Sequence, residues 1–401
     1  PLSIVYLGLD DFPLGLAETQ KVRLVSRALI AEGCRVTLIS RRWSVGKWRD
    51  TAGLTPRGTF EGIEYENVCG YLYRPPNGWL LRKVAWIRGL LREPLIIARL
   101  RRAGRLDLAI VSTGTFSRVF EYWLYARLLG FPLAVHLVEN YQAIYRDSSW
   151  KKRLNAWLFD RHVYRLVDGA LPISRSLIDR LEHYAPGMPW LKDPGLVDLS
   201  RFEGLVRKPG KPYLLFCGYL GYMEIVRFIL EAFEAAKVGP EVGLRMVVNG
   251  SGKDFEQYHA LRRSLSKGER VETISGVTDR ELSQLYLDAY GLLIPLRPTD
   301  QDRARFPHKI GEYCGSGRPV ITTSIGEVGE RFAHGVNAYV APRYEIAAYA
   351  QAIEEALAAP ERADAVGAAG RKLAEEQFEY RRFGRAMKQF AERLAFGPEK
   401  A

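Results

Sequence analysis

A lysine and a glutamate three residues apart, Lys309 and Glu312, are the pair of side chains in this 401-residue chain that best suits chemistry. They follow Pro307, a residue favoured in the first turn of a helix, so both are expected on one helix face near its N-terminus. Such a helix start binds anions, and Lys309 would add a positive charge for a phosphate. Glu312 could accept hydrogen bonds from a sugar or ribose. The same spacing also fits an ion pair on a solvated helix.

The residues after Glu312 extend this pattern without a gap to Val340. They include a Gly-x-Pro-Val sequence at 317–320, a glycine-rich acidic turn at 326–330 and an Asn-containing turn at 334–337. This run resembles the sugar-nucleotide site of GT-B glycosyltransferases, in particular glycosyltransferase family four (glycosyl transferases group one). Weaker similarities cover most of the chain. The resemblance therefore implies an α/β fold of the GT-B type, with two facing Rossmann-like doubly wound domains and a cleft between them.

The resemblance assigns roles only to residues that match the family pattern. Glu312 would hold the ribose hydroxyls of a nucleotide, and Lys309 would lie beside the diphosphate or the donor sugar. The backbone at Val277 would border the base, and strand-end glycines would let the backbone approach the nucleotide. The expected donor-binding set is Gly15, Gly218, Asn249, Gly250, Val277, Arg305, Lys309, Glu312 and Glu330.

Two departures from the family pattern affect the contacts with the sugar and the phosphates. Ala304 stands eight residues before Glu312, where the family often has a glutamate that contacts the donor sugar. The stretch 218–224 lacks the arginine and lysine that the family often places on the phosphates. A leaving diphosphate still needs cationic neighbours. The local candidates are Lys309, Arg303, Arg305 and Arg227.

His136 and Glu139 are the catalytic candidates in the first half of the chain. His136 ends a predicted strand over residues 133–137, and the family commonly has a histidine there that touches the donor sugar. A lone histidine also fits a structural role. Asp300 and Asp302 match a short metal-binding pattern of another glycosyltransferase fold, but a solvated turn is the simpler interpretation. No metal or other cofactor is expected, since the nucleotide sugar acts as a co-substrate.

Residues 74–105 combine positive charge with large apolar side chains. They hold nine Lys and Arg residues and one acid, Glu93, in a chain whose formal net charge is +12. Apolar residues opposite arginines are typical of a helix lying in a bilayer interface, and the charges would bind anionic lipid. We expect two helices here, separated at Pro94. A helical wheel places Trp79, Trp86, Leu90 and Ile97 on one side. The expected membrane contacts are Trp79, Trp86, Arg88, Arg92 and Arg99.

Two other interpretations of the basic stretch are a core helix with a solvated basic face and a nucleic-acid surface. Nucleic acid is not expected as a partner, because no helix-turn-helix, zinc-finger or RNA-binding signature accompanies the charge. The four cysteines are scattered without a CxxC pair, which argues against a zinc or redox site and for a reducing compartment. The chain opens on a strand-like sequence, not on a secretory leader.

The elements that must position these residues follow a repeated strand–helix pattern. Predicted strands lie at 3–7, 36–39, 108–111, 133–137, 169–173, 213–216, 244–248, 271–274, 292–295 and 319–322, and helices fall between them. This alternation implies parallel sheets covered on both faces, which bind ligands at the carboxyl ends of their strands. Thr278 and Glu281 predict a capping box for the helix at 279–288.

A Pro/Gly-rich linker at 208–212 divides the pattern into two blocks. We expect an N-terminal acceptor-side domain over residues 1–205 and a nucleotide-sugar domain over 206–379. A final helix within 380–401 is expected to pack back on the first domain.

The sequence thus predicts a glycosyltransferase that moves a sugar from a nucleotide diphosphate sugar, such as a UDP sugar, to a lipid-linked or membrane-borne glycan acceptor. The family resemblance suggests retention of configuration. The expected role is cell-surface polysaccharide or glycolipid synthesis, in the cytoplasm and peripherally on the inner face of the cell membrane. The alternatives are a sugar-nucleotide epimerase of the same fold and a non-catalytic membrane-associated partner protein.

Overall fold

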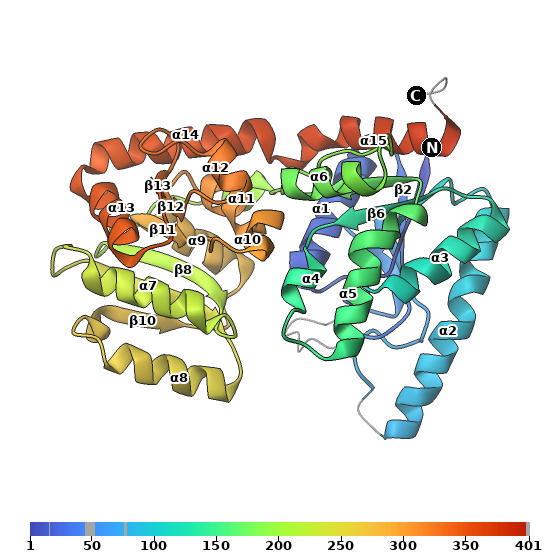
Figure 1. The fold of residues 1–401 in the computed structure, drawn as a ribbon, viewed down its shortest axis with the longest axis horizontal. Coiled ribbons are helices and arrows are strands. Elements are labelled where there is room, and N and C mark those ends of the chain that lie inside the picture. Colours follow the sequence, from blue (N-terminus) through green and yellow to red (C-terminus); the bar gives the residue numbers. More distant parts are fainter. Residues whose placement is uncertain (16, 45–52, 76–77, 398–401) are drawn as a thin grey trace. The chain divides into compact units, whose positions relative to one another are not determined.

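The computed structural model of the protein describes residues 1–15, 17–44, 53–75 and 78–397 (Figure 1). The chain forms two compact units, one from Pro1–Leu196 with Tyr380–Ala401 and one from Val197–Glu379. Each unit has its own hydrophobic core around a parallel sheet. The doubly wound α/β architecture predicted from the sequence is confirmed.

The first unit is built on a seven-stranded sheet with the order β3-β4-β2-β1-β5-β6-β7. Every neighbouring pair is parallel except the hairpin of β3 and β4. The strands are β1 (Ser3–Leu7), β2 (Arg35–Ser40), β3 (Arg57–Phe60), β4 (Ile63–Asn67), β5 (Leu108–Val111), β6 (Leu133–Leu137) and β7 (Gly169–Pro172). The helices are α1 (Ala17–Ala31), α2 (Trp79–Arg102), α3 (Phe116–Leu129), α4 (Tyr141–Ile144), α5 (Trp150–His162), α6 (Arg175–Tyr184) and α15 (Tyr380–Phe396).

The strand order decides which helices share a face of the first sheet. The connections through α2, α3 and α5 all advance in one direction across the sheet, so right-handed crossovers place these helices on one face. The connection through α1 runs the opposite way and places α1 on the other face, where α15 packs against it. Gly384 allows this helix contact, because a Cβ there would lie 2.6 Å from the carbonyl oxygen of Ala28.

Helix α2 is continuous over 24 residues, so the predicted break at Pro94 is wrong. A proline removes one backbone hydrogen bond from a helix and crowds the preceding turn. Here the buried residues of α2 lie on both sides of the proline, and their packing holds the two halves in line. These residues are Ala85, Gly89, Glu93, Ile96, Ile97 and Leu100.

The second unit is built on a six-stranded parallel sheet with the order β10-β9-β8-β11-β12-β13. Its strands are β8 (Tyr213–Tyr219), β9 (Gly243–Asn249), β10 (Val271–Ile274), β11 (Gly291–Ile294), β12 (Val320–Thr323) and β13 (Tyr339–Ala341). Its helices are α7 (Met223–Ala235), α8 (Gly252–Arg263), α9 (Asp279–Asp288), α10 (Asp300–Ala304), α11 (His308–Gly315), α12 (Glu327–Arg331), α13 (Ile346–Ala358) and α14 (Pro360–Gln377). The capping box predicted before α9 is confirmed. The sequence pattern does not predict β3, β4 or β13.

The chain enters the second unit at Val197, earlier than the expected boundary after residue 205. The short helix η2 (Leu199–Phe202) already packs against α9 and α11. The stretch 208–212 therefore lies inside the second unit, and the backbone N–H of Lys208 donates to Asp288 at 2.7 Å. Its Pro/Gly composition marks a loop and not a boundary between domains.

Candidate active site

Five of the donor residues expected from the sequence lie along the carboxyl edge of the second sheet. Gly218 lies near the end of β8, Asn249 ends β9, and Val277 lies between β10 and α9. Lys309 and Glu312 lie on α11, which follows β11. Because β8 stands between β9 and β11, the edge includes the point where the chain reverses its direction across the sheet. Open parallel sheets bind ligands at such a point.

Glu312 is held by three side chains at this edge. Its Oε1 atom pairs with the guanidinium of Arg201 and lies 3.8 Å from Nε2 of His308, and its Oε2 atom accepts a hydrogen bond from Tyr286 at 3.3 Å. The side chain is 14% exposed. The alternative of a simple surface ion pair between Lys309 and Glu312 is wrong, since the ion-pair partner of Glu312 is an arginine more than a hundred residues earlier. A carboxylate has about four acceptor positions, so hydroxyl groups can still bind to it.

The surroundings of Glu312 keep its carboxyl group ionised. Burial alone would raise the pKa of Glu312, but Arg201 and then His308 and Lys309 hold that pKa below its usual value of 4.5. A depressed carboxyl pKa stabilises the folded chain above the unfolded pKa, and this stabilisation is lost as the pH falls through the folded pKa.

Glu312→Gln should therefore lower the free energy of unfolding by about 1–3 kcal/mol at pH 7, because Arg201 loses a charged partner. The difference from the parent should shrink as the pH falls below 4.5. Urea unfolding at a series of pH values measures both effects. If the parent and the variant differed in free energy of unfolding by the same amount at pH 7 and pH 3.5, the depressed pKa of Glu312 would be contradicted.

Lys309 contributes positive charge to the same edge. Burial raises the pKa of Cys217, and the charge of Lys309 acts against this rise, so the lysine acts electrostatically on the end of β8. The backbone N–H of Cys217 donates to the hydroxyl of Tyr313 at 3.0 Å, which ties β8 to α11. The fold thus brings Lys309 and Glu312 together with the end of β8. Arg201 and Tyr286 complete this group, and no spacing in the sequence points to either of them.

Two other expected donor residues lie apart from this group. Arg305 pairs with Asp302 at 2.8 Å, and Asp302 also pairs with Arg297 at 3.0 Å. Asp302 is fully buried, so its interpretation as part of a solvated turn is wrong. Glu330 is exposed on α12, whereas Glu327 is buried one turn earlier.

Three of the expected donor glycines are explained by packing within the chain. A Cβ at Gly15 would lie 2.8 Å from the carbonyl oxygen of Asp11. A Cβ at Gly250 would lie 2.9 Å from the side-chain Cβ of Leu220, and one at Gly218 would lie 2.4 Å from a neighbouring aromatic ring. Close packing therefore accounts for glycine at each position, and contact with a nucleotide stays a prediction.

His136 lies inside the first unit near the carboxyl end of β6 and is 2% exposed. Its Nε2 atom lies 3.3 Å from the hydroxyl of Tyr6, and the two rings are stacked. Burial, followed by the charge of Lys21, holds the pKa of His136 well below its usual value. The imidazole is therefore neutral, and its buried Nδ1 atom has no hydrogen-bond partner among the described residues.

A buried lysine extends this group beyond the residues that the sequence singled out. Lys21 on α1 contacts Oγ of Ser112 at 3.5 Å, and Ser112 donates to Glu18 at 2.8 Å. Burial lowers the pKa of Lys21, although Glu18 and Glu139 act in the opposite direction. Glu139 and His136 thus both lie near Lys21, in one polar cluster at the carboxyl edge of the first sheet. Only the fold reveals Lys21, because its position on α1 looks like any solvated helical lysine.

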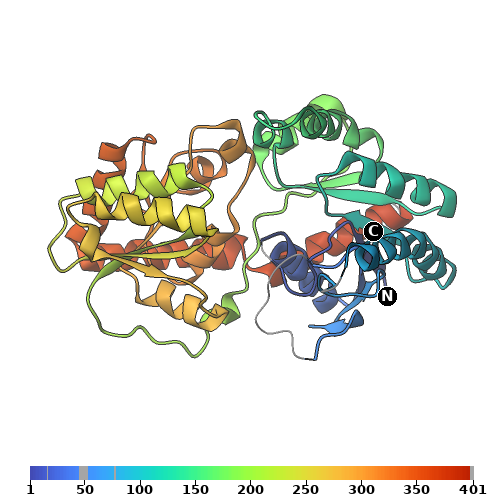
Figure 2. The same cartoon turned by 90° about the horizontal axis from the view of Figure 1, so that it is seen from below.

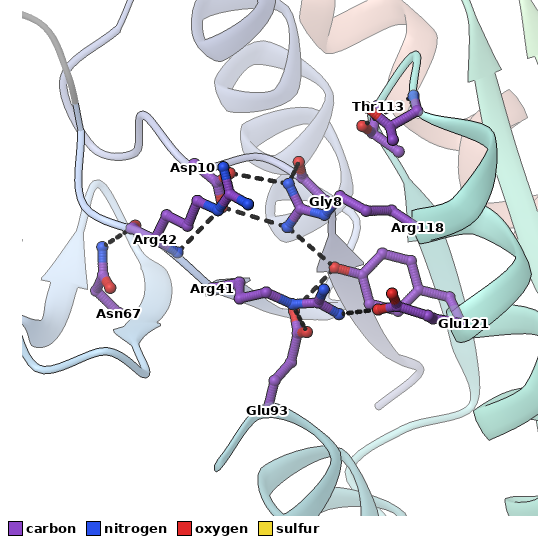
Figure 3. Close-up of polar contacts among 11 residues, drawn as sticks. Gly8, Asp10, Arg41, Arg42, Asn67, Glu93, Thr113, Arg118 and Glu121 are labelled. Carbon is purple, nitrogen blue, oxygen red and sulfur yellow. Dashed lines mark hydrogen bonds and ion pairs between the residues drawn. The ribbon is translucent and has the colours of Figure 1, made fainter. Parts of the chain in front are cut away.

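A second polar network crosses the ends of β1 and β2 (Figure 3). Arg41 pairs with Glu93 of α2 and with Glu121 of α3, and Tyr122 donates to Glu93 at 2.8 Å. Arg118 of α3 continues the network through four hydrogen bonds. It donates to Asp10 at 2.8 and 3.3 Å, to the carbonyl of Gly8 at 3.1 Å and to the hydroxyl of Tyr122 at 3.2 Å. The network fixes α2 and α3 to the strand ends.

The apolar membrane residues expected on α2 differ in exposure. The side chain of Trp79 is 67% exposed and that of Trp86 is 39% exposed. Ile97, which the helical wheel places on the same side, is fully buried. The predicted apolar face is therefore wrong at this end of the helix, because the half of α2 after Pro94 turns that side toward the core.

The basic residues expected at the membrane are also unequal. Arg88 is exposed. Arg92 and Arg99 lie 3.5 and 3.6 Å from the carboxylate of Glu66 on β4. Two of the three expected arginines thus have an acidic neighbour in the sheet.

Within the described ranges, no helix is both long and apolar enough to cross a bilayer. In the same part of the chain, no group of three or more His, Cys, Asp or Glu side chains could hold a metal ion.

Two family models match the chain, one in each half. Residues 200–373 match the model described as glycosyl transferases group 1, and residues 19–187 match the glycosyl transferase 4-like domain. No curated protein sequence matches the chain.

Several solved structures share the fold over nearly their whole length. Sucrose-phosphate synthase from Thermosynechococcus elongatus superposes with a TM-score of 0.76 at 16% identity, over 98% of this chain and 99% of that chain. HepE from Anabaena, in complex with UDP and glucose, superposes with a TM-score of 0.68 at 14% identity, over 97% of this chain and 98% of that chain. WaaG, a glycosyltransferase involved in lipopolysaccharide biosynthesis, superposes with a TM-score of 0.65 at 15% identity, over 99% of this chain and 100% of that chain. At such identities the similarity is evidence for the fold.

Proposed function

Since the chain belongs to the glycosyl transferases group 1 family of GT-B glycosyltransferases, we propose that it transfers a sugar from a nucleotide diphosphate sugar to a lipid-linked or other membrane-borne glycan acceptor. The evidence for a membrane-borne acceptor is the surface of α2, where tryptophan and aliphatic side chains are exposed among basic residues. Exposed apolar side chains beside basic residues favour an enzyme that works at a lipid surface.

The donor is proposed to be a UDP sugar bound at the carboxyl edge of the second sheet. HepE, which shares the fold, has been solved in complex with UDP and glucose. Support from this chain comes from Lys309 and from Glu312, which stays ionised beside Arg201. A fixed carboxylate accepts hydrogen bonds from vicinal hydroxyls, and a lysine near a helix N-terminus attracts phosphate.

In the proposed reaction, the bond between C1 of the sugar and the diphosphate oxygen breaks. A bond from C1 to an acceptor oxygen forms, and the proton of the acceptor hydroxyl passes to the departing diphosphate. The negative charge that develops on the diphosphate is stabilised by Lys309 and the start of α11. Retention of configuration is proposed from the family, and no metal or cofactor is assigned to the reaction.

His136→Ala should lower turnover by about 10²-fold if the imidazole positions the donor sugar, since small displacements of a reacting group have effects of this size. UDP affinity should change little, because the nucleotide is assigned to the other unit. Steady-state kinetics and calorimetry with UDP measure the two quantities.

Tyr6→Phe serves as the matched control, because it removes the hydroxyl near Nε2 of His136 while keeping the ring contact. A folded His136→Ala variant with parental turnover would show that the histidine is structural. So would a variant that loses activity only because it unfolds.

Labelled UDP sugars incubated with the protein and a membrane lipid extract test the proposed function. Transfer predicts release of UDP together with label in the organic phase. An epimerase would convert the donor without releasing UDP in proportion to product, and a non-catalytic partner protein would do neither. The proposed place of action is the cytoplasmic face of a membrane, where the protein would be peripherally bound.

A further inference from the structure

We propose that the outer faces of α2, α3 and α5 form one docking surface for an anionic lipid bilayer. This inference rests on the proposed function, which needs access to a membrane-borne acceptor. It adds two helices, α3 and α5, that have no assigned role in the site. The surface formed by these three outer faces is called the three-helix surface below.

Each of the three helices carries an exposed apolar stripe at helical spacing. On α2 the exposed residues Leu80, Val84, Ile87, Leu91 and Leu95 recur at intervals of three and four. On α3 the stripe is Phe120, Leu124 and Leu128, and on α5 it is Trp150, Leu154 and Trp157. Residues three and four apart lie on one face of a helix. The exposed fractions range from 39% at Trp157 to 73% at Leu128, so these stripes are not part of the core.

The three helices are neighbours on one face of the first sheet. Helix α3 contacts both α2 and α5, and Figures 1 and 2 show it between them. The inward side of α3 is occupied by Val119, Tyr122 and Ala126, which are buried. Its Phe120 stripe therefore faces away from the sheet. The same reasoning applies to α5, whose buried residues are Ala156, Phe159 and Asp160.

Charge selects the occupant of the three-helix surface. The three helices contain thirteen Lys and Arg residues but only three acids, Glu93, Glu121 and Asp160. Each acid is paired with an arginine: Glu93 and Glu121 with Arg41, and Asp160 with Arg180 at 3.1 Å. Acids outside these helices pair with four of the arginines: Arg92 and Arg99 with Glu66, Arg118 with Asp10 and Arg127 with Asp168. The cations outnumber these acids as well, so the outer side is basic and an anionic surface complements it.

The aromatic residues of the surface stand beside cations. The ammonium group of Lys83 lies 4.5 Å from the ring centre of Trp79, and that of Lys151 lies 5.8 Å from the ring centre of Trp150. The guanidinium of Arg161 lies 5.6 Å from the ring centre of Trp157. Tryptophan is enriched at membrane–water interfaces, where its apolar ring and polar edge are both accommodated. Aromatic rings flanked by cations suit the headgroup layer of an anionic leaflet.

A second copy of the chain is a less suitable occupant. In a two-fold symmetric dimer the same patch meets itself, so the basic residues of one copy would face those of the other. Like charges brought together in this way repel. A bilayer with acidic headgroups satisfies both the apolar stripes and the cations.

Vesicle binding by the full chain tests the proposal with two variants. One changes the charge of the three-helix surface, and the other changes its apolar side chains. Lys151→Glu, Lys152→Glu and Arg153→Glu together reverse the exposed charges of α5. This variant should bind vesicles of phosphatidylcholine and phosphatidylglycerol at least about 10²-fold more weakly, as expected for three basic residues near the surface. Phe120→Ser, Leu124→Ser and Leu128→Ser together remove the apolar stripe of α3. This second variant should bind more weakly at both low and high salt, since salt screens only the charges.

The matched control carries the same charge change on other parts of the first unit: Arg35→Glu, Arg382→Glu and Arg385→Glu. All three residues are exposed, and Arg382 and Arg385 lie on α15, across the sheet from the three-helix surface. The control should bind vesicles within about 5-fold of the parent, apart from the general effect of net charge. Transfer of sugar to a water-soluble acceptor should be equal in all variants, which shows that they are folded.

The proposal is overturned if the α5 and α3 variants bind vesicles as the parent does. It is also overturned if the α3 variant splits a dimer of the parent and vesicle binding is unchanged, since the surface would then join two copies. Failure of the proposed function looks different. In that case the parent would bind anionic vesicles through the three-helix surface but would transfer no sugar to any lipid acceptor.

Discussion

Replacing Lys309 with alanine should lower turnover by about 10²–10³-fold, the usual effect of removing one group that stabilises charge in the transition state. Lys309 lies in the first turn of α11, and its charge reaches both Glu312 and Cys217 at the end of β8. In the variant, a diphosphate leaving from this edge would no longer have this positive charge beside it. Release of UDP from a UDP sugar under saturating donor measures the effect.

Two control variants separate a role in the reaction from a role in folding. Lys309→Arg keeps the positive charge and should retain more turnover than Lys309→Ala. Lys211→Ala removes an exposed lysine before β8 and should leave turnover unchanged. If Lys309→Ala turns over within about two-fold of the parent, the lysine takes no part in the reaction and the phosphate must be stabilised elsewhere.

Replacing Arg41 with alanine should destabilise the first unit by about 3–5 kcal/mol, because it leaves a buried carboxylate without its arginine. Glu93 is fully buried, and Arg41 is 5% exposed. Burial raises the pKa of Glu93, whereas Arg41, Arg118 and Tyr122 act against that rise. Without Arg41 the carboxyl group must take up a proton or remain charged in the core. Urea unfolding followed by circular dichroism measures the loss.

The same network offers a rescue and a surface comparison. Arg41→Met combined with Glu93→Leu removes both buried charges and should be more stable than Arg41→Ala alone, since apolar replacements of a buried pair are often tolerated. Arg343→Ala breaks the exposed pair with Glu345 and should change stability by less than about 1 kcal/mol. Equal stability of Arg41→Ala and Arg343→Ala would refute the claim that the network holds α2 to the sheet.

The alternation of strands and helices could be predicted from the sequence, and so could the family to which the chain belongs. Both depend on local patterns: apolar spacing, capping residues such as Thr278 with Glu281, and the unbroken motif from Glu312 to Val340. Local patterns persist in the folded chain because the backbone of each element is decided largely by its own residues and neighbours. Strands β9 to β12 therefore lie within a residue or two of where they were predicted.

The exposure of α2 was decided by the tertiary structure. A helical wheel of residues 79–102 shows which side chains share a face, but not which face the sheet covers. Glu93 looks like a surface acid within a basic helix, yet it is buried because Arg41 approaches from β2. Packing of α2 against the first sheet likewise places Ile97 in the core and Arg99 beside Glu66. Packing of both halves against the sheet also overrides the tendency of Pro94 to break the helix.

The partners of the site residues were likewise invisible in the sequence. Arg201 is 111 positions before Glu312, and Lys21 is 115 positions before His136. Nothing in the spacing of such remote residues marks them as neighbours, because their contact depends on the order of strands in each sheet. The three-helix surface has the same origin. The stripes on α3 and α5 are short apolar patterns that a core helix would also show, and only the folded unit reveals that they face outward, since the opposite sides of both helices already cover the sheet.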